Sequence, residues 1–165
     1  MTNQQWTERA GFLLEAHSVV RFTAAEICPV GKVEKRAILE APDPPLLLNA
    51  LELIFVLMWA RAREGDAAIA VNSWYRSTAY NRAAGGGKTS IHLLAGAADI
   101  TKKGWTPRRL AMALHLAHPY SRKLGIGLYD DFVHVDVRGL LGRRAPARWP
   151  KKGPLAHWWR VGALS

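Results

Sequence analysis

The feature that most constrains the fold is a run of fifteen residues, Leu46 to Ala60, that only two polar side chains interrupt. The run is shorter than the ~20 residues that an α-helix needs to cross a bilayer. Asp43 is placed to cap a helix here, Pro44 suits the first turn, and Gly65 suits a position just past the end. Since this helix is apolar on nearly every side, we expect it to be a central core helix.

The rest of the pattern alternates helices with short strands. Two strands are expected to meet in a tight turn at Asp130-Asp131. The mixture predicts an α+β fold, in which helices flank a small, mostly antiparallel sheet. The expected helices are 6–20, 78–84 and 106–118, with a short turn capped by Thr23, and the expected strands are 67–72, 96–101, 125–129 and 132–137.

The chain length of 165 residues predicts one domain, residues 1–165, with its core at about 22–139. The tail, 141–165, is too short to bury a core of its own. Two interpretations of it stay open: a basic surface whose tryptophans fold back onto the domain, or an element that binds anionic cell-wall polymer or lipid. Its members are Arg143, Arg144, Arg148, Lys151, Lys152 and Arg160, with Trp149, Trp158 and Trp159.

The net charge is +10, from 23 basic and 13 acidic residues, and it favours an anionic partner. Charge alone would also suit a nucleic-acid binder, which should bind DNA in a salt-dependent way that survives chelation. The single cysteine, Cys28, excludes an intrachain disulfide and a cysteine-based zinc site. Residues 1–11 lack the basic and apolar regions of a signal peptide, which predicts synthesis in a cytoplasm.

The stretch GGGKTSIH, residues 85–92, has two competing interpretations. Gly-Lys-Thr-Ser could end a phosphate-binding P-loop, but the position five residues before Gly87 is Arg82, in a segment that favours a helix. In the second interpretation, the glycines form a flexible wall of a cleft, and His92 is the first residue of a metal site. The sequence favours this second interpretation.

Three side chains form a donor set for a metal. His92 and Asp99 are seven residues apart, with small residues between them that let both side chains reach one point. His134 lies in an alternating strand, where it shares a face with Phe132 and Asp136 while valines line the other face. Two imidazoles and one carboxylate suit catalytic zinc, which keeps its fourth position open for water.

Two further residues suit the chemistry of hydrolysis. Asp131, three residues before His134, is placed to act as the general base, and Asp130 is its rival. Arg76 directly follows a core strand and could stabilise a developing oxyanion. Asp136 either orients a ligand histidine or pairs with Arg138.

Two other histidines, His115 and His118, lie one helical turn apart and are rival metal ligands. Their place near a helix C-terminus favours a structural role.

The segments SWYRSTAYNRAAGGGKTSIHLLAGAADI and GIGLYDDFVHVDVRG resemble the zinc D-Ala-D-Ala carboxypeptidase and L-alanyl-D-glutamate endopeptidase family. These are cell-wall peptidases of bacteria and phages, and they share their fold with the hedgehog signalling domain. The family pattern is Ser-x-His-x-x-Gly-x-Ala-x-Asp, followed by an acidic residue three before a final histidine. The matching residues are Ser90, His92, Ala97, Asp99, Asp131 and His134, and Arg76 matches an arginine after a Ser-Gly-Tyr-type turn.

The resemblance implies that His92, Asp99 and His134 bind one zinc ion, that Asp131 is the general base and that Arg76 stabilises the oxyanion. It also makes Ser90 and Tyr75 substrate-binding residues. Ala95 stands where the family has glycine, a departure that affects the fit of substrate more than the binding of metal.

The predicted function is zinc-dependent hydrolysis of peptidoglycan stem peptides by a phage-type endolysin. Such an enzyme is made in the host cytoplasm and acts on the wall after release, where its basic surface binds anionic polymer. No nucleic-acid partner and no transmembrane segment are expected. The alternative is a zinc-bearing cell-wall-binding module without catalysis. The sequence leaves open whether the bond cut is D-Ala-D-Ala, L-Ala-D-Glu or a cross-link.

Overall fold

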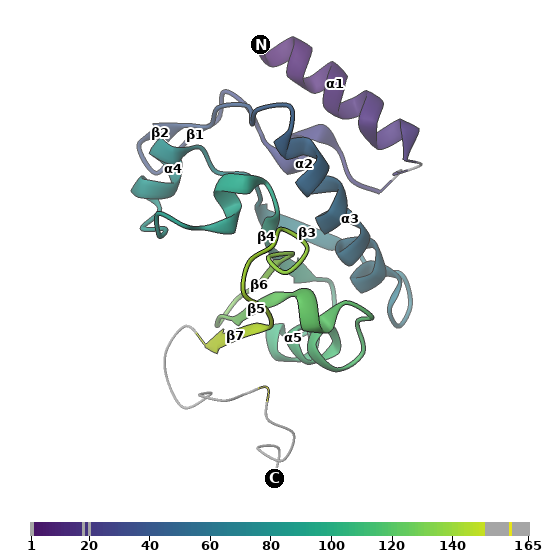
Figure 1. The fold of residues 1–165 in the computed structure, drawn as a ribbon. Helices are drawn as coiled ribbons and strands as arrows, with labels where there is room; N and C mark the ends of the chain where they lie inside the picture. Colours follow the sequence, from purple (N-terminus) through teal and green to yellow (C-terminus); the bar gives the residue numbers. More distant parts are fainter. Residues whose placement is uncertain (1, 18, 20, 151–158, 160–165) are drawn as a thin grey trace. The chain divides into compact units, whose positions relative to one another are not determined.

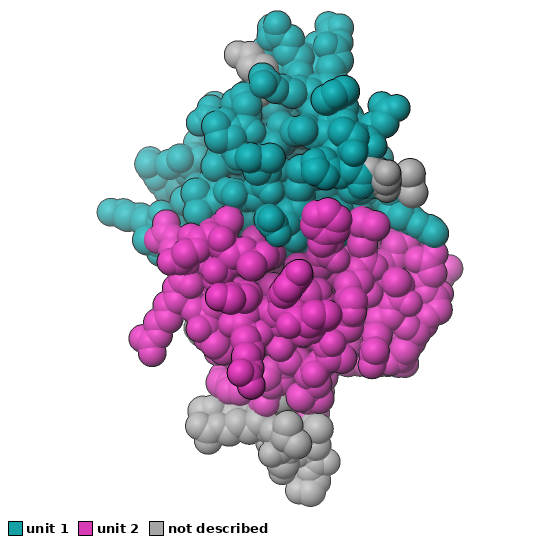
Figure 2. Space-filling view, turned by 45° about the vertical axis from the view of Figure 1, so that its right-hand side comes forward, with its two compact units in different colours: residues 1–54, 73–98 teal, residues 55–72, 99–165 magenta. Residues whose placement is uncertain are grey.

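The structure is a computed structural model that describes residues 2–17, 19, 21–150 and 159. The described residues form two compact units, one from residues 1–54 and 73–98 and the other from residues 55–72 and 99–165 (Figure 2). Helix α3 and strands β3 and β4 each contribute residues to both units. The prediction of a single domain stays a prediction, and the units are described in turn.

The first unit is mainly helical (Figure 1). Helix α1 packs against α2 and begins at a capping box, in which Thr2 and Gln5 exchange side-chain and backbone hydrogen bonds. This cap places α1 three residues earlier than predicted. The elements are α1 (Asn3–Ala16), α2 (Ala24–Ile27), β1 (Val33–Glu34), β2 (Ala37–Ile38), the first half of α3 (Leu46–Ala62), α4 (Thr78–Ala83) and the 3-10 helix η1 (Ile91–Leu94).

Helix α3 confirms the expectation of a core helix on most of its surface. Leu53, Ile54 and Leu57 are fully buried, whereas Leu48 and Phe55 are exposed. In the second unit, the buried ammonium of Lys102 donates to the carbonyls of Ala60, Arg61 and Arg63, and so caps the C-terminus of α3. Within the described residues, no helix has the length and apolar character that a membrane span requires.

The second unit is built on a five-stranded sheet with the order β3-β4-β6-β5-β7. Strands β5 and β6 pair in antiparallel fashion, and the backbone N–H of Tyr129 donates to Phe132 (3.1 Å) across the predicted Asp130-Asp131 turn. The elements are most of β3 (Ile69–Ser73) and β4 (Ala97–Lys102), α5 (Pro107–Leu116), the 3-10 helix η2 (Ser121–Lys123), β5 (Gly125–Leu128), β6 (Val133–Asp136) and β7 (Ala147–Pro150).

Strand β7 comes from the tail and was not predicted. It pairs with β5 in parallel, so the sheet is mixed, and the α+β fold class is confirmed. Val133 and Val135 of β6 and Val137, just past its end, are fully buried, as the alternation predicted, and α5 contacts both β5 and β6.

The rival histidines near the end of α5 have structural partners. His115 receives a hydrogen bond from Arg148 Nε (3.2 Å). His118 is 5% exposed, its ring lies edge-on to Trp59 with centroids 4.7 Å apart, and its Nδ1 accepts from the backbone N–H of Tyr120 (3.0 Å). Burial lowers the pKa of His118 from 6.5 to about 4.

Acid is therefore expected to destabilise the fold through His118. The unfolded histidine takes up a proton near pH 6.5 and the folded one only near about 4, so the unfolded state binds more protons between these values. The free energy of unfolding therefore decreases as the pH is lowered through this window. At ~1.4 kcal/mol per pKa unit, the loss approaches about 3 kcal/mol. Urea unfolding at several pH values measures it: His118→Asn should flatten the dependence, and the exposed control His17→Asn should not. An unchanged slope in His118→Asn would contradict the assignment.

Candidate metal centre

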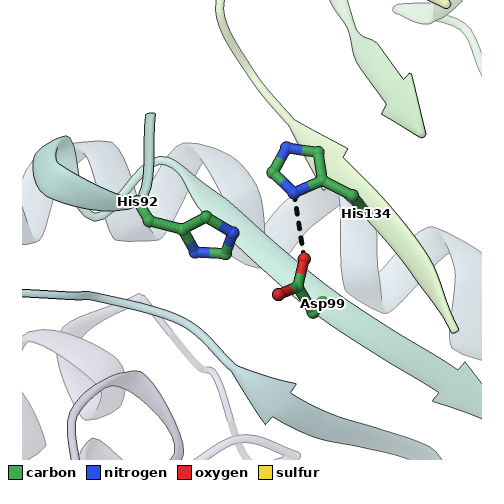
Figure 3. Close-up of side chains that lie close together, drawn as sticks. All are labelled: His92, Asp99 and His134. Atoms are coloured by element: carbon green, nitrogen blue, oxygen red, sulfur yellow. Dashed lines mark hydrogen bonds and ion pairs between the residues drawn. The ribbon is translucent and has the colours of Figure 1, made fainter. Parts of the chain in front are cut away.

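Three buried side chains, His92, Asp99 and His134, come together in the structure (Figure 3). One potential ligand atom from each lies within 4.8 Å of the others, and the residues are 2%, 7% and 9% exposed. Two imidazole nitrogens and a carboxylate oxygen are donors that zinc accepts in catalytic sites. The group could therefore hold one metal ion, and its chemistry fits zinc.

The orientation of His92 is set by the backbone of Trp74. Because a carbonyl oxygen can only accept, the short contact of 2.6 Å between His92 Nδ1 and the Trp74 carbonyl requires a proton on Nδ1. In the neutral imidazole, Nε2 then carries the lone pair that a metal needs. The buried indole of Trp74 is held in turn by its N–H, which donates to the Ala95 carbonyl (2.8 Å).

Ala95, which stands where the family pattern has glycine, occupies a backbone conformation that favours glycine. It follows η1 in the left-handed backbone conformation, with φ 57°, a conformation that glycine adopts without steric cost. Alanine keeps this conformation at a cost of about 1 kcal/mol. Ala95 thus closes the turn after His92 in this conformation, and its carbonyl accepts from Trp74.

His134 lies between two carboxylates. Its Nδ1 is 2.9 Å from Asp99 Oδ1, and its Nε2 is 3.0 Å from Asp136 Oδ2. Asp136 is fully buried and also accepts from Arg138 Nε (2.8 Å) and Nη2 (2.6 Å). Both roles considered for Asp136 thus occur together: it pairs with Arg138 and it orients His134. The other ring nitrogen of His134, Nδ1, faces Asp99 and is therefore the one available to a shared metal ion.

The charged partners of Asp136 keep this carboxylate ionised beside His134. Burial by itself raises the pKa of Asp136, but hydrogen bonds from Arg138 and His134 outweigh it and hold that pKa well below its usual range. Burial likewise lowers the pKa of His134, but hydrogen bonds to Asp136 and Asp99 outweigh it and raise that pKa. Asp136 therefore stays ionised while it holds Nε2 of His134.

The other predicted site residues lie outside this group of three. Asp131 is exposed in the turn between β5 and β6, next to the equally exposed Asp130. Arg76 is linked to His92 through the backbone, because its N–H donates to the His92 carbonyl (3.1 Å), and its Nε donates to Ser73 Oγ (2.9 Å).

The two predicted substrate-binding residues neighbour the metal donors along the chain. Ser90 immediately precedes η1, two residues before His92, and is half-buried. Tyr75 follows Trp74, and burial, assisted by nearby acidic groups, raises the pKa of its hydroxyl.

Sequence reasoning missed one residue beside the donors. The ring of Trp149, on β7, lies with its centroid 5.3 Å from that of His134. The only sequence signal was the pair of glycines in β5, Gly125 and Gly127, which leave space on the face that carries His134. Trp149 folds back onto the second unit, as one interpretation of the tail proposed. Lys151, Lys152, Trp158 and Arg160 lie outside the described residues.

A family model described as Peptidase M15 matches residues 20–136, which is more than half of the chain. No curated protein matches the sequence. The matched region contains all three donors, together with Arg76 and Asp131. Peptidases of this family depend on zinc, and the three donors could hold one such ion. A peptidoglycan-type substrate is what the family suggests. The chain therefore belongs to the peptidase M15 family and is a zinc metallopeptidase.

Proposed function

We propose that the protein hydrolyses the stem peptides of peptidoglycan as a phage-type endolysin. The observation that carries this proposal is the group of three buried donors, in which Trp74 orients one imidazole and Asp136 the other. Such a preset donor set suits a metal that must keep a position open for chemistry rather than a purely structural ion.

In this proposal His92 Nε2, Asp99 and His134 Nδ1 hold the zinc ion. Zinc in such a set is a Lewis acid that lowers the pKa of water to about 7. The residues of the chain supply the remaining steps.

Asp131 accepts the proton of the attacking water and returns it to the leaving amine, so that a carbon–oxygen bond forms as the peptide carbon–nitrogen bond breaks. Its exposed position on the β5–β6 turn gives it access to solvent. The guanidinium of Arg76 binds the carbonyl oxygen as negative charge develops there. Ser90 and Tyr75 contact the substrate.

The net charge of +10 supports an anionic substrate surface such as a cell wall. In this proposal the enzyme is made in the host cytoplasm and acts on the wall after release. Attraction between exposed charges should weaken as salt is added. Binding to intact cell walls is therefore expected to fall between low and physiological ionic strength.

Hydrolysis of purified peptidoglycan tests the proposal. Cleavage should stop when a chelator removes the metal and return when zinc is added back. Mass spectrometry of the products identifies the bond: release of D-alanine marks carboxypeptidase activity, and a new D-glutamate amino terminus marks endopeptidase activity. If zinc binds at one equivalent and no product forms, the protein is instead a non-catalytic wall-binding module.

A further inference from the structure

Three strands of the second unit bring His134 and Trp149 to opposite sides of one glycine. Gly127, on strand β5 between β6 and β7, pairs with His134 of β6 on one side and with Trp149 of β7 on the other. Residues paired across neighbouring strands point to the same face of a sheet. Strands two apart are separated by about 10 Å, so only a large side chain can span the gap.

The absence of a side chain at Gly127 is what lets the indole cross β5. A Cβ atom built there would lie 2.6 Å from Cε2 of Trp149, which is far inside van der Waals contact. With hydrogen in its place, the rings of Trp149 and His134 approach to 5.3 Å between centroids at an interplanar angle of 49°. The glycine thus creates the contact between the tail and the histidine.

Trp149 is also held from two other directions. Its Nε1 donates to the hydroxyl of Tyr129 (3.4 Å), and the guanidinium of Arg138 lies 5.0 Å from the centroid of an indole ring. The same guanidinium binds Asp136, which contacts His134 Nε2. These four residues, His134, Asp136, Arg138 and Trp149, form a closed cycle of contacts.

We infer that Trp149 is a positioning residue for His134, and that β7 is therefore part of the metal centre. Asp136 fixes one ring nitrogen of His134, and Trp149 packs against the ring and restricts its rotation. The second ring nitrogen then stays directed toward Asp99. The inference rests on the proposed function, in which His134 is a zinc ligand. Preset ligand orientation raises metal affinity, and loss of an outer partner costs about 10–100-fold.

Zinc affinity of Trp149→Ala, measured by competition with a chromophoric chelator, tests the inference. We expect the dissociation constant to rise at least about 10-fold and Trp149→Phe to recover most of the loss. The matched control is Trp105→Ala, because Trp105 is also half-buried in this unit. Its ring centroid lies 4.2 Å from Lys102 Nζ and 4.2 Å from Arg109 Cζ, so it too packs against cations. That control should lower the unfolding midpoint of the metal-free protein without weakening zinc binding.

A second readout needs no metal. The Nε2 proton of His134, bonded to Asp136, should give a slowly exchanging imidazole N–H signal in the metal-free wild type. This signal should be lost in Trp149→Ala and kept in Trp105→Ala. If the alanine variant does not fold, Trp149→Leu keeps an apolar side chain on the strand and should show the same losses.

The outcomes separate the inference from the proposed function. Unchanged zinc affinity and an unchanged imidazole signal in Trp149→Ala would overturn the inference, as would an equal loss of affinity in Trp105→Ala. If the wild type binds no zinc, the proposed function fails, and the imidazole signal still decides whether Trp149 positions His134.

Discussion

Replacing His134 with alanine is expected to abolish zinc binding and peptidase activity together. The substitution removes one of the three donors and also the imidazole that joins Asp99 to Asp136. Loss of an outer partner of a ligand costs about 10–100-fold in affinity or activity, so loss of a direct ligand should exceed 100-fold. Metal content after dialysis should fall from one equivalent to none, and hydrolysis of peptidoglycan should fall below detection.

A buried histidine outside the donor group provides the control for this experiment. His118→Asn removes an imidazole from the same unit but no metal donor. It should retain one equivalent of zinc and its hydrolytic rate at a temperature where it is folded. Retention of zinc by His134→Ala would show that His134 is not a ligand.

Replacing Asp131 with asparagine should lower turnover but, unlike His134→Ala, should leave zinc bound. Asparagine matches aspartate in shape but cannot accept and return a proton at neutral pH. Loss of a general base costs about 10²–10⁴-fold in kcat. Because Asp131 is exposed, the unfolding free energy should change by no more than about 0.5 kcal/mol.

The neighbouring carboxylate, Asp130, provides a control for this assignment. Asp130 is equally exposed in the same turn, so Asp130→Asn is a matched control that should keep both zinc and activity. If Asp131→Asn turns over at the wild-type rate while Asp130→Asn does not, Asp130 is the base. Normal rates in both variants would remove the turn from the mechanism.

The features predicted correctly from sequence are those with local causes. Strand β6 was predicted because valines alternate with His134 and Asp136, and this period of two places the two sets on opposite faces. Its turn with β5 was predicted because Asp130 and Asp131 separate two apolar runs. The coming together of the three donors was predicted from their spacing and from the family resemblance.

The features missed depend on contacts between distant segments. Strand β7 is a four-residue segment of the basic tail that lies between Pro146 and Lys151 and ends in a proline, and only pairing with β5 makes Ala147–Pro150 a strand. Strands β1 and β2 are two residues each, and their turn places Lys35 and Arg36 at positive φ, where a hairpin signal would have asparagine or glycine. Propensity does not reveal either element, because pairing decides both.

The pairing of β7 with β5 bears on how a minimal catalytic fragment of this enzyme should be cut. The family match stops at residue 136, and a fragment trimmed there would lack both Arg138 and β7. It would leave β5 as an open edge strand, whose unpaired amides and carbonyls favour association with other chains. A soluble fragment should therefore extend at least through Pro150, and fusion partners belong beyond that residue.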